Sequence, residues 1–367
     1  MSTQGPRQHK FYIDVPLLLL LLALMSVGLM VLYSAGGMEK MSAQALRFGV
    51  GLTVMALVLL IPRYVIRFFA PLFYLLTVVL LLMVYLFGVN INGSQRWLNI
   101  GIATIQPSEI AKISIPLMLA YYYHAKSLPP SWKDIAISVI VIVIPTLLVF
   151  KQPDLGTAIL VASSGLVLLF LTGISWRLIG MTVVAIAGLA PLFWMRLMSP
   201  YQKERVLTFL NPASDPTGSG YNIIQSKIAI GSGGLTGKGY MQGVQSSEFL
   251  PEHTTDFIFA VFSEEFGFFG VVLLCLLYLL ILLRGFWLAV NMTDNFSRLL
   301  SGAFMFIFFA YFFINMSMVS GILPVVGLPL PLVSYGGTSI ITIMLAFGLM
   351  MNLYGARDTE QTGRGRI

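Results

Sequence analysis

A stretch of 17 residues near the C-terminus constrains the fold more than any other part of this chain. Residues 321–337 lie between two long apolar segments, yet they carry three prolines and four glycines. That density of helix breakers excludes a continuous helix, and the stretch is too apolar for a loop in water. Non-helical backbone at membrane depth must be buried in protein or line a wet cavity. We therefore expect a broken, partly re-entrant segment close to a binding site.

The remainder of the chain is dominated by apolar segments of membrane-spanning length. Of 367 residues, 57% are hydrophobic and 10% are charged, whereas a soluble domain carries about a quarter charged residues. We predict an all-α polytopic membrane protein with ten transmembrane helices, a large outer loop at 199–255 and the broken segment before the last helix. The single integral domain spans residues 1–367. The ten segments are 14–35, 45–62, 66–88, 108–124, 135–151, 154–173, 176–198, 256–284, 297–321 and 338–355.

The distribution of charge predicts the orientation. The net charge is +7, but the basic residues follow the topology, so we expect no nucleic-acid partner. With the N-terminus in the cytoplasm, the cytoplasmic segments hold twelve Lys or Arg residues and the short outer loops and helix ends hold five. This bias fits the positive-inside rule and places both termini in the cytoplasm. The five outer residues are Lys40, Arg47, Arg96, Lys151 and Arg196.

Cysteine and histidine offer little chemistry. Cys275 is the single cysteine, so no disulfide forms within the chain. His9, His124 and His253 are far apart in the sequence and lack the spacing of a zinc site. A divalent cation, Mg or Mn, held by carboxylate and phosphate oxygens remains compatible with the composition.

Three acidic residues occupy the same place in the predicted topology. Glu109 and Asp154 follow Gln-Pro pairs, Asp256 follows a short polar run, and each stands at the start of a helix that enters from outside. All three are therefore expected near the outer surface. Proline before the first turn and an acid within it are ordinary helix-start signals, so one reading is that these carboxylates only cap helices.

Lys112 supports a second reading. It follows Glu109 by three residues, on the same helical face, and a lysine inside a span normally faces the bundle interior with a partner. The pair either fixes packing or forms a charged wall for an anionic head group, and the sequence leaves both open. Glu264 and Glu265 lie deeper in the span after Asp256, where we expect at least one to be protonated or paired.

Carboxylates at the outer mouth of an apolar cavity suit glycosyl transfer from a polyprenyl-pyrophosphate sugar. A partly buried carboxylate can act as general base on a sugar hydroxyl. The pyrophosphate leaving group needs nearby cations. The candidate cations are Arg96, Lys112, Lys151, Arg205 and Lys227.

Two further features have alternative readings. The glycine-rich run 231–239 is followed by Tyr240, where a phosphate-binding loop needs Ser or Thr. We expect a flexible hinge there, and the alternative is that its backbone amides touch a pyrophosphate. Arg96 with Trp97 is either an interfacial anchor or a substrate contact.

Six strings, in order along nearly the whole chain, resemble the SEDS family (shape, elongation, division, sporulation). Residues 319–332 look more like the branch that acts in cell elongation than the branch that acts in division. The strings are Gln95–Leu98, Gln106–Ile113, Gln152–Thr157, Gln225–Leu235, Thr255–Ala260 and the run 321–337.

The resemblance implies a peptidoglycan glycosyltransferase of cell elongation and rod shape. Such enzymes polymerise lipid II on the outer face of the cytoplasmic membrane, release undecaprenyl pyrophosphate, and work with a class B penicillin-binding protein, a transpeptidase, and other elongation-complex proteins. The family's essential aspartate falls on Asp256, which implies the general base for the acceptor 4-hydroxyl. Its sensitive Glu and Lys fall on Glu109 and Lys112, and Asp154 matches a further acidic site.

Two other functions compete with this one. Ten spans with a broken segment also suit a flippase for lipid-linked sugars, although a transporter should carry midplane charges. A non-catalytic scaffold that recruits a transpeptidase is the other. Polymer made from lipid II by the purified protein, and its loss on Asp256 substitution, distinguish the enzyme from both.

Overall fold

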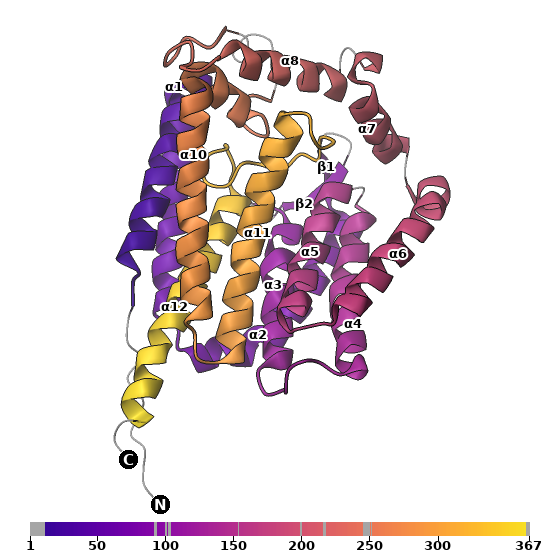
Figure 1. The fold of residues 1–367 in the computed structure, drawn as a ribbon, viewed down its shortest axis with the longest axis vertical. Coiled ribbons are helices and arrows are strands. Elements are labelled where there is room, and N and C mark those ends of the chain that lie inside the picture. The colour runs from indigo at the N-terminus through magenta and orange to yellow at the C-terminus, as the bar shows by residue number, and fades with distance from the viewer. Residues whose placement is uncertain are drawn as a thin grey trace, which may run out of the picture.

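Long helices that run roughly side by side form the body of the molecule (Figure 1). A computed structural model describes residues 12–91, 94–99, 101, 104–152, 154–198, 200–215, 218–244, 250 and 252–364. Pro153, part of one of the Gln-Pro corners, and residues 245–249 of the predicted outer loop lie outside these ranges. The helices are α1 (Val15–Leu59), α2 (Arg63–Phe87), α3 (Pro107–Tyr123), α4 (Trp132–Phe150), α5 (Leu155–Leu171), α6 (Trp176–Leu192), α7 (Pro200–Leu210), α8 (Ser219–Ser232), α10 (Ile258–Val290), α11 (Asn295–Val319) and α12 (Thr338–Arg364).

Helix α1 consists of two antiparallel arms that meet at Gly37. The φ of Gly37 is +68°, a left-handed conformation that glycine adopts readily. The Tyr12 ring lies 5.1 Å from the Tyr354 ring, and the Asn352 side chain donates to the Val58 carbonyl at 2.8 Å. Both outer ends of α1 therefore lie beside the same part of α12, and the two predicted segments 14–35 and 45–62 form a hairpin.

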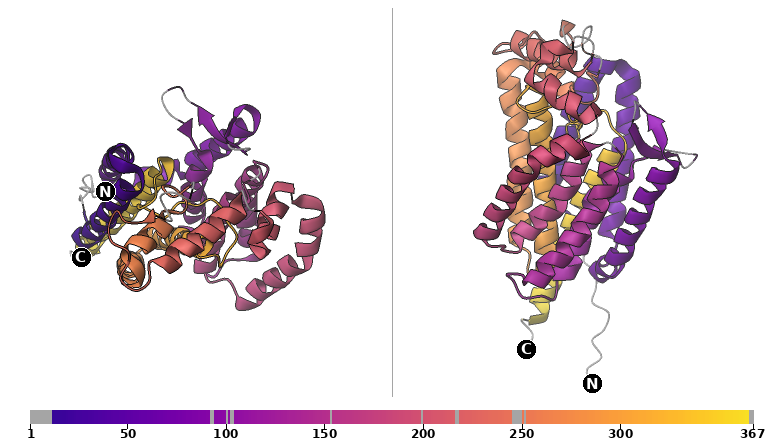
Figure 2. Two further views of the ribbon diagram at one scale, coloured as in Figure 1. Left: turned by 90° about the horizontal axis from the view of Figure 1, so that it is seen from above. Right: turned by 90° about the vertical axis from the view of Figure 1, so that its right-hand side faces the viewer.

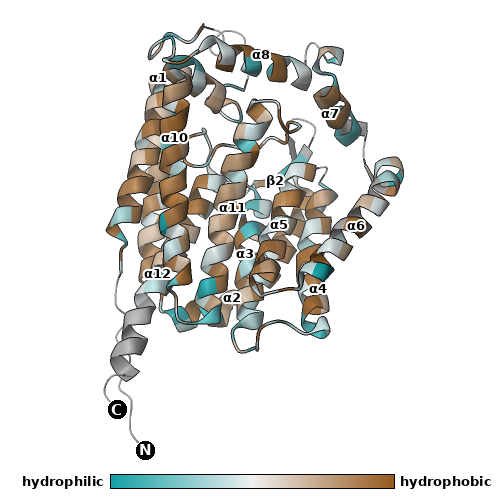
Figure 3. Cartoon of the chain, in the orientation of Figure 1, coloured by the Kyte–Doolittle hydropathy of each residue, from teal (hydrophilic) through white to brown (hydrophobic). Residues whose placement is uncertain are grey.

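The predicted helical, multi-pass architecture is confirmed, because each of the ten predicted segments overlaps a helix. The number of crossings stays a prediction. Six helices of the described chain are long and apolar enough to span a membrane, and α1 counts among them once although it has two arms. Hydrophobic residues dominate the helices, and hydrophilic ones gather mainly toward the two ends of the bundle (Figure 3).

Three short strands were not expected in an all-α protein. They are β1 (Val89–Ile91), β2 (Ser94–Asn99) and β3 (Thr104–Ile105), paired antiparallel in the order β1-β2-β3. The sheet occupies the predicted outer segment between α2 and α3 and places β2 over the start of α3. In the other long outer segment, α7 and α8 cross one end of the bundle, and α6 leads away from the remaining helices to reach them (Figures 1 and 2).

Helix α10 is broken at Gly267, and the glycine-rich run 231–239 seals the break. Gly267 has a φ of +63°. The amides of Lys238 and Gly239 donate to the carbonyls of Glu264 and Glu265, while the amides of Phe268 and Phe269 donate to carbonyls of the run. The prediction of a flexible hinge is therefore wrong, because four backbone hydrogen bonds hold the run against α10. We call residues 231–239 the clasp. Its amides at 238 and 239 are used within the chain, which also argues against the pyrophosphate alternative.

The clasp also accounts for the two glutamates in α10. Lys238 Nζ donates to Glu264 Oε1 at 2.6 Å. Glu265 Oε1 accepts from the Met241 amide at 3.1 Å and from the Ser34 hydroxyl. Both carboxylates are buried, so the expectation that at least one is paired is confirmed.

Candidate active site

A cavity of about 340 Å³ lies at the end of the bundle opposite Tyr12 and Tyr354. It collects residues from the second arm of α1, strand β2, α3, α5, the turn before α10, the broken segment and α12. Three of the predicted acids and one predicted cation therefore meet in one place. The lining residues are Arg47, Arg96, Trp97, Gln106, Glu109, Asp154, Thr157, Thr255, Asp256, Gly327, Leu328, Pro329, Tyr335, Gly336, Gly337, Thr338 and Ser339.

Asp256 stands in the turn that precedes α10, outside the helix itself, and is half-buried. Burial raises its pKa to about 6, and the charge of Glu252 adds to the rise. Arg205 and Arg96 act in the opposite direction on the same pKa. No described residue forms an ion pair with the Asp256 carboxylate within 4 Å. The turn thus presents a carboxylate poised to take up a proton near neutral pH.

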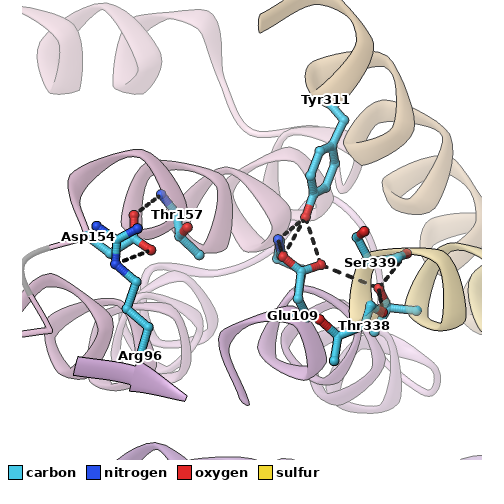
Figure 4. A network of polar contacts seen from close by, with 9 residues as sticks. Arg96, Glu109, Asp154, Thr157, Tyr311, Thr338 and Ser339 are labelled. Carbon is cyan, nitrogen blue, oxygen red and sulfur yellow. Dashed lines mark hydrogen bonds and ion pairs between the residues drawn. The ribbon is translucent and has the colours of Figure 1, made fainter. Parts of the chain in front are cut away.

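Asp154 begins α5 and is tied on both sides (Figure 4). Its Oδ1 accepts from the Thr157 amide at 3.1 Å, as a helix N-cap does. Its Oδ2 lies 3.2 Å from Arg96 Nε, an ion pair without hydrogen-bond alignment. Asp154 therefore caps α5, as the sequence indicated, while its supporting role in the site stays a prediction. The ion pair holds strand β2 against α5.

Glu109, Lys112 and Tyr311 form a buried cluster, in which the Tyr311 hydroxyl is directed at the Glu109 carboxylate (Figure 4). Lys112 Nζ donates to Glu109 Oε1 at 2.5 Å and also contacts the Tyr311 hydroxyl. Tyr311 in turn donates to Glu109 Oε2 at 2.9 Å. Glu109 lines the large cavity, but Lys112 lines a smaller, apolar one behind it. The geometry favours the packing interpretation for Lys112, because its charge is already balanced by Glu109 and it does not line the large cavity.

The broken segment holds the turn of Asp256 in place through backbone and side-chain hydrogen bonds. Ser334 Oγ donates to the Thr255 carbonyl at 2.6 Å, and the Tyr335 amide donates to the Thr254 carbonyl at 2.9 Å. The buried Asn315 side chain on α11 donates both to the Asp256 carbonyl at 2.8 Å and to the Leu328 carbonyl at 2.6 Å. The predicted non-helical backbone is thus confirmed as a scaffold within the protein that lines the cavity.

Gly327 brings this scaffold against the catalytic candidate. Its φ is +73°, and a Cβ placed there would lie 3.4 Å from Asp256 Oδ2. Leu332 also takes a positive φ, +59°, which is uncommon for a residue with a side chain. The turn around Leu332 is packed against Gly28, where a Cβ would approach the Leu332 carbonyl to 2.5 Å. Close backbone packing at Gly28 therefore fixes the broken segment around Leu332, and Gly327 brings it into contact with the Asp256 carboxylate.

Arg205 and Lys227 lie outside the cavity lining. Arg205 Nη1 donates to the Val325 carbonyl at 3.2 Å, and its charge still reaches Asp256. Lys227 is exposed on α8 and lies against Gly321, where a Cβ would come within 2.5 Å of its Nζ. Arg205 is therefore brought to the site, whereas Lys227 is placed at the start of the broken segment and away from the acids.

Among the described residues, no group of three His, Cys, Asp or Glu side chains is arranged to hold a metal ion. Glu109 and Asp154 already accept hydrogen bonds and face cations. Asp256 is the one lining acid whose oxygens are not engaged in this way. The described donors alone therefore do not form a magnesium or manganese site, and the use of a divalent cation stays a prediction.

Sequence reasoning missed three residues that complete the site. Gln44 is buried in α1, donates to the Ser334 carbonyl at 2.9 Å and accepts from the Gly336 amide. Tyr335 presents its ring to Arg47, whose guanidinium carbon lies 4.0 Å from the ring centre. Gln44 and Arg47, polar residues at the start of an apolar segment, were the available signal, because such residues normally face the protein interior.

Comparison with known proteins agrees with this architecture. The family model described as "Cell cycle protein", FtsW/RodA/SpoVE, matches residues 13–359. Peptidoglycan glycosyltransferase MrdB of Escherichia coli K12 is 50% identical over 97% of this chain and 98% of its own length. Peptidoglycan glycosyltransferase RodA of Treponema pallidum is 33% identical over 93% of this chain and 97% of its own length.

Solved structures show the same fold. A chain of a peptidoglycan synthase complex that coordinates polymerization and crosslinking superposes with a TM-score of 0.83 at 34% identity, covering 94% of this chain and 98% of that one. The crystal structure of the rod shape determining protein RodA of Thermus thermophilus gives 0.72 at 30% identity, covering 94% and 97%. The family model and the relatives each span more than nine tenths of the sequence, so this chain belongs to the FtsW/RodA/SpoVE family, the SEDS proteins that its motifs resemble.

Proposed function

We propose that this protein is a peptidoglycan glycosyltransferase that polymerises lipid II into glycan strands and releases undecaprenyl pyrophosphate. One observation carries the assignment of the base: Asp256 is the acid of the cavity lining that neither caps a helix nor pairs with a cation among the described residues. The relatives named peptidoglycan glycosyltransferases support the reaction class.

The proposed chemistry needs one base and a stabilised leaving group. The acceptor sugar hydroxyl gives its proton to the Asp256 carboxylate as its oxygen bonds to the donor anomeric carbon. The bond from that carbon to the diphosphate oxygen breaks, and the electron pair stays on the diphosphate. A pKa of about 6 leaves Asp256 mostly ionised at neutral pH, so the base is ready without being so acidic that it cannot hold a proton.

We further propose the setting expected from the sequence. The chain lies in the cytoplasmic membrane with both termini in the cytoplasm, so that the cavity faces outward, where lipid II is polymerised. A class B penicillin-binding protein and other elongation-complex proteins are the proposed partners, supported by the likeness to a chain of a peptidoglycan synthase complex. A divalent cation, if used, enters with the diphosphate, because the described residues do not hold one by themselves.

The test is polymer formation by the purified protein with its cognate transpeptidase. Wild type, Asp256→Asn and Glu39→Gln receive lipid II, and products are resolved by gel electrophoresis after lipid removal. Glu39 is an exposed carboxylate beside the bend of α1, so its replacement controls for loss of charge at that end. Polymer from wild type and Glu39→Gln but not from Asp256→Asn supports the proposal. Full activity of Asp256→Asn refutes the base, and lipid movement between leaflets without polymer supports a flippase instead.

A further inference from the structure

Two charged residues of the cavity lining form no ion pair among the described residues. The ion pairs described above engage Arg96, Asp154 and Glu109. Of the five charged lining residues, that leaves one cation, Arg47, and one carboxylate, Asp256. A pocket that performs transfer from a diphosphate needs a base for the acceptor hydroxyl and a cation for the leaving group, and Asp256 and Arg47 are residues of these two kinds.

Arg47 is held as a binding residue would be. It comes from the second arm of α1, and its guanidinium stacks on the Tyr335 ring at 4.0 Å, which fixes the plane of the side chain. Its Nη1 is buried and has no hydrogen-bond acceptor among the described residues. A buried donor on a cation without an acceptor is costly, so the geometry calls for an anionic acceptor in the cavity.

The surroundings of Arg47 suit an anion with several oxygens. Thr338 and Ser339, the first residues of α12, line the same cavity, and the first N–H groups of a helix lack partners within the helix and favour negative charge. Gly337 precedes them, and a Cβ built there would lie 3.9 Å from Arg47 Nε. A guanidinium fork and amide groups converge here, an arrangement that matches phosphate oxygens.

We propose that Arg47 binds the diphosphate of the polyprenyl-linked donor and stabilises the charge that develops on it when the sugar leaves. This inference rests on the proposed glycosyl transfer and assigns a residue to its leaving group. Arg47 replaces the five cations that the sequence suggested for this role. Arg96 and Lys112 face acids, Lys227 lies against Gly321, and Lys151 and Arg205 lie outside the lining.

Lys40 provides a matched control on the same helix arm. It lies seven residues before Arg47, and its Nζ lies over the same Tyr335 ring, 4.6 Å from the ring centre. Lys40 is not part of the cavity lining. The two cations therefore share an aromatic neighbour and an element, and they differ in access to the cavity.

The experiment measures binding of undecaprenyl diphosphate, undecaprenyl monophosphate and inorganic pyrophosphate to the full-length protein in nanodiscs. Wild type is compared with Arg47→Ala, Arg47→Lys and Lys40→Ala, and thermal melting checks that each variant is folded. We expect Arg47→Ala to weaken diphosphate binding by about tenfold to hundredfold, the range for a lost hydrogen bond to a charged group. Arg47→Lys should bind with an affinity between those of wild type and Arg47→Ala, since it keeps the charge and loses the guanidinium fork. Lys40→Ala should stay within about twofold of wild type, because Lys40 lies outside the cavity lining.

Each other outcome overturns the inference. Unchanged diphosphate binding in folded Arg47→Ala or in Arg47→Lys removes the role of the guanidinium, and an equal loss in Lys40→Ala reduces it to general charge. Inorganic pyrophosphate that binds as tightly as the lipid shows a free-anion site, whereas equal binding of the monophosphate shows that the diphosphate is not read. None of these binding measurements requires polymer formation, so the two proposals can fail separately. Binding that depends on Arg47 without polymerisation refutes the proposed glycosyltransferase function alone. Polymerisation with binding that does not depend on Arg47 refutes this inference alone.

Discussion

The rate of glycan synthesis should follow the ionisation of Asp256. Its pKa rises from 3.8 to about 6, through burial first and the charge of Glu252 second. A base works only when ionised, so the rate constant should fall as the pH drops below about 6, by about tenfold for each further unit. At pH 7 about nine in ten Asp256 side chains are ionised and the rate is close to its plateau.

Two neighbouring charges should move this pH dependence in opposite directions. Glu252→Gln removes a negative charge that raises the Asp256 pKa, so the pKa falls and activity persists to lower pH. Arg205→Gln removes a positive charge that lowers the pKa, so the midpoint moves to higher pH. A unit charge about 10 Å away, at an effective dielectric of about 40, shifts a pKa by about 0.6 unit. Arg205→Lys keeps the charge and should leave the midpoint in place.

The assay is the initial rate of polymer formation from lipid II between pH 5 and pH 8 at constant ionic strength. Glu252 is exposed, so its effect should shrink at high salt. Arg205 also holds the Val325 carbonyl, and the lysine variant separates that contact from the charge. Midpoints that stay together in Glu252→Gln and Arg205→Gln, or move the same way, would show that another group controls the profile.

Three further substitutions test the packing that supports the site. Gly237→Ala should lower the melting temperature and the activity, because its φ is +82° and the new Cβ would lie 2.0 Å from a backbone carbonyl of α10; Gly234→Ala, with φ +55° and open space, is the control that carries strain without the clash. Lys112→Met should destabilise by about 3–5 kcal/mol by leaving Glu109 unpaired, and the double variant Glu109→Gln/Lys112→Met should recover most of it; equal melting of single and double variants contradicts a structural pair. Asn315→Leu should lower kcat with the transpeptidase still bound, since two backbone carbonyls lose their donor at about 1–3 kcal/mol each; wild-type kcat would show that the turn of Asp256 is held by other contacts.

Much of the architecture could be predicted because apolar length and helix breakers are local signals. The acids meet in one cavity because each lies in or just before the first turn of a helix at the same end of the bundle, and a topology prediction already contains this arrangement. The contacts of these acids could not be predicted. Lys112 contacts Tyr311, which is 199 positions away in the sequence. Arg96, the partner of Asp154, lies on a strand that the composition of the polar outer segment does not indicate. The glycine-rich run was misread for the same reason, as its hydrogen-bond partners lie in a helix beyond it.

The structure separates the three acids by what each carboxylate accepts. Asp154 caps α5 and takes a helix amide, a position that stabilises the negative charge. Glu109 takes a lysine and a tyrosine, so its charge is balanced. Asp256 precedes α10, whose cap residue Phe257 makes no side-chain hydrogen bond, and it therefore has burial without the compensation of a cap. Burial of a carboxylate without compensating hydrogen bonds raises its pKa toward neutrality. The turn that precedes α10 produces this state, because Asn315 and Ser334 hold its backbone at residues 255 and 256. The Asp256 carboxylate itself is left free to take a proton.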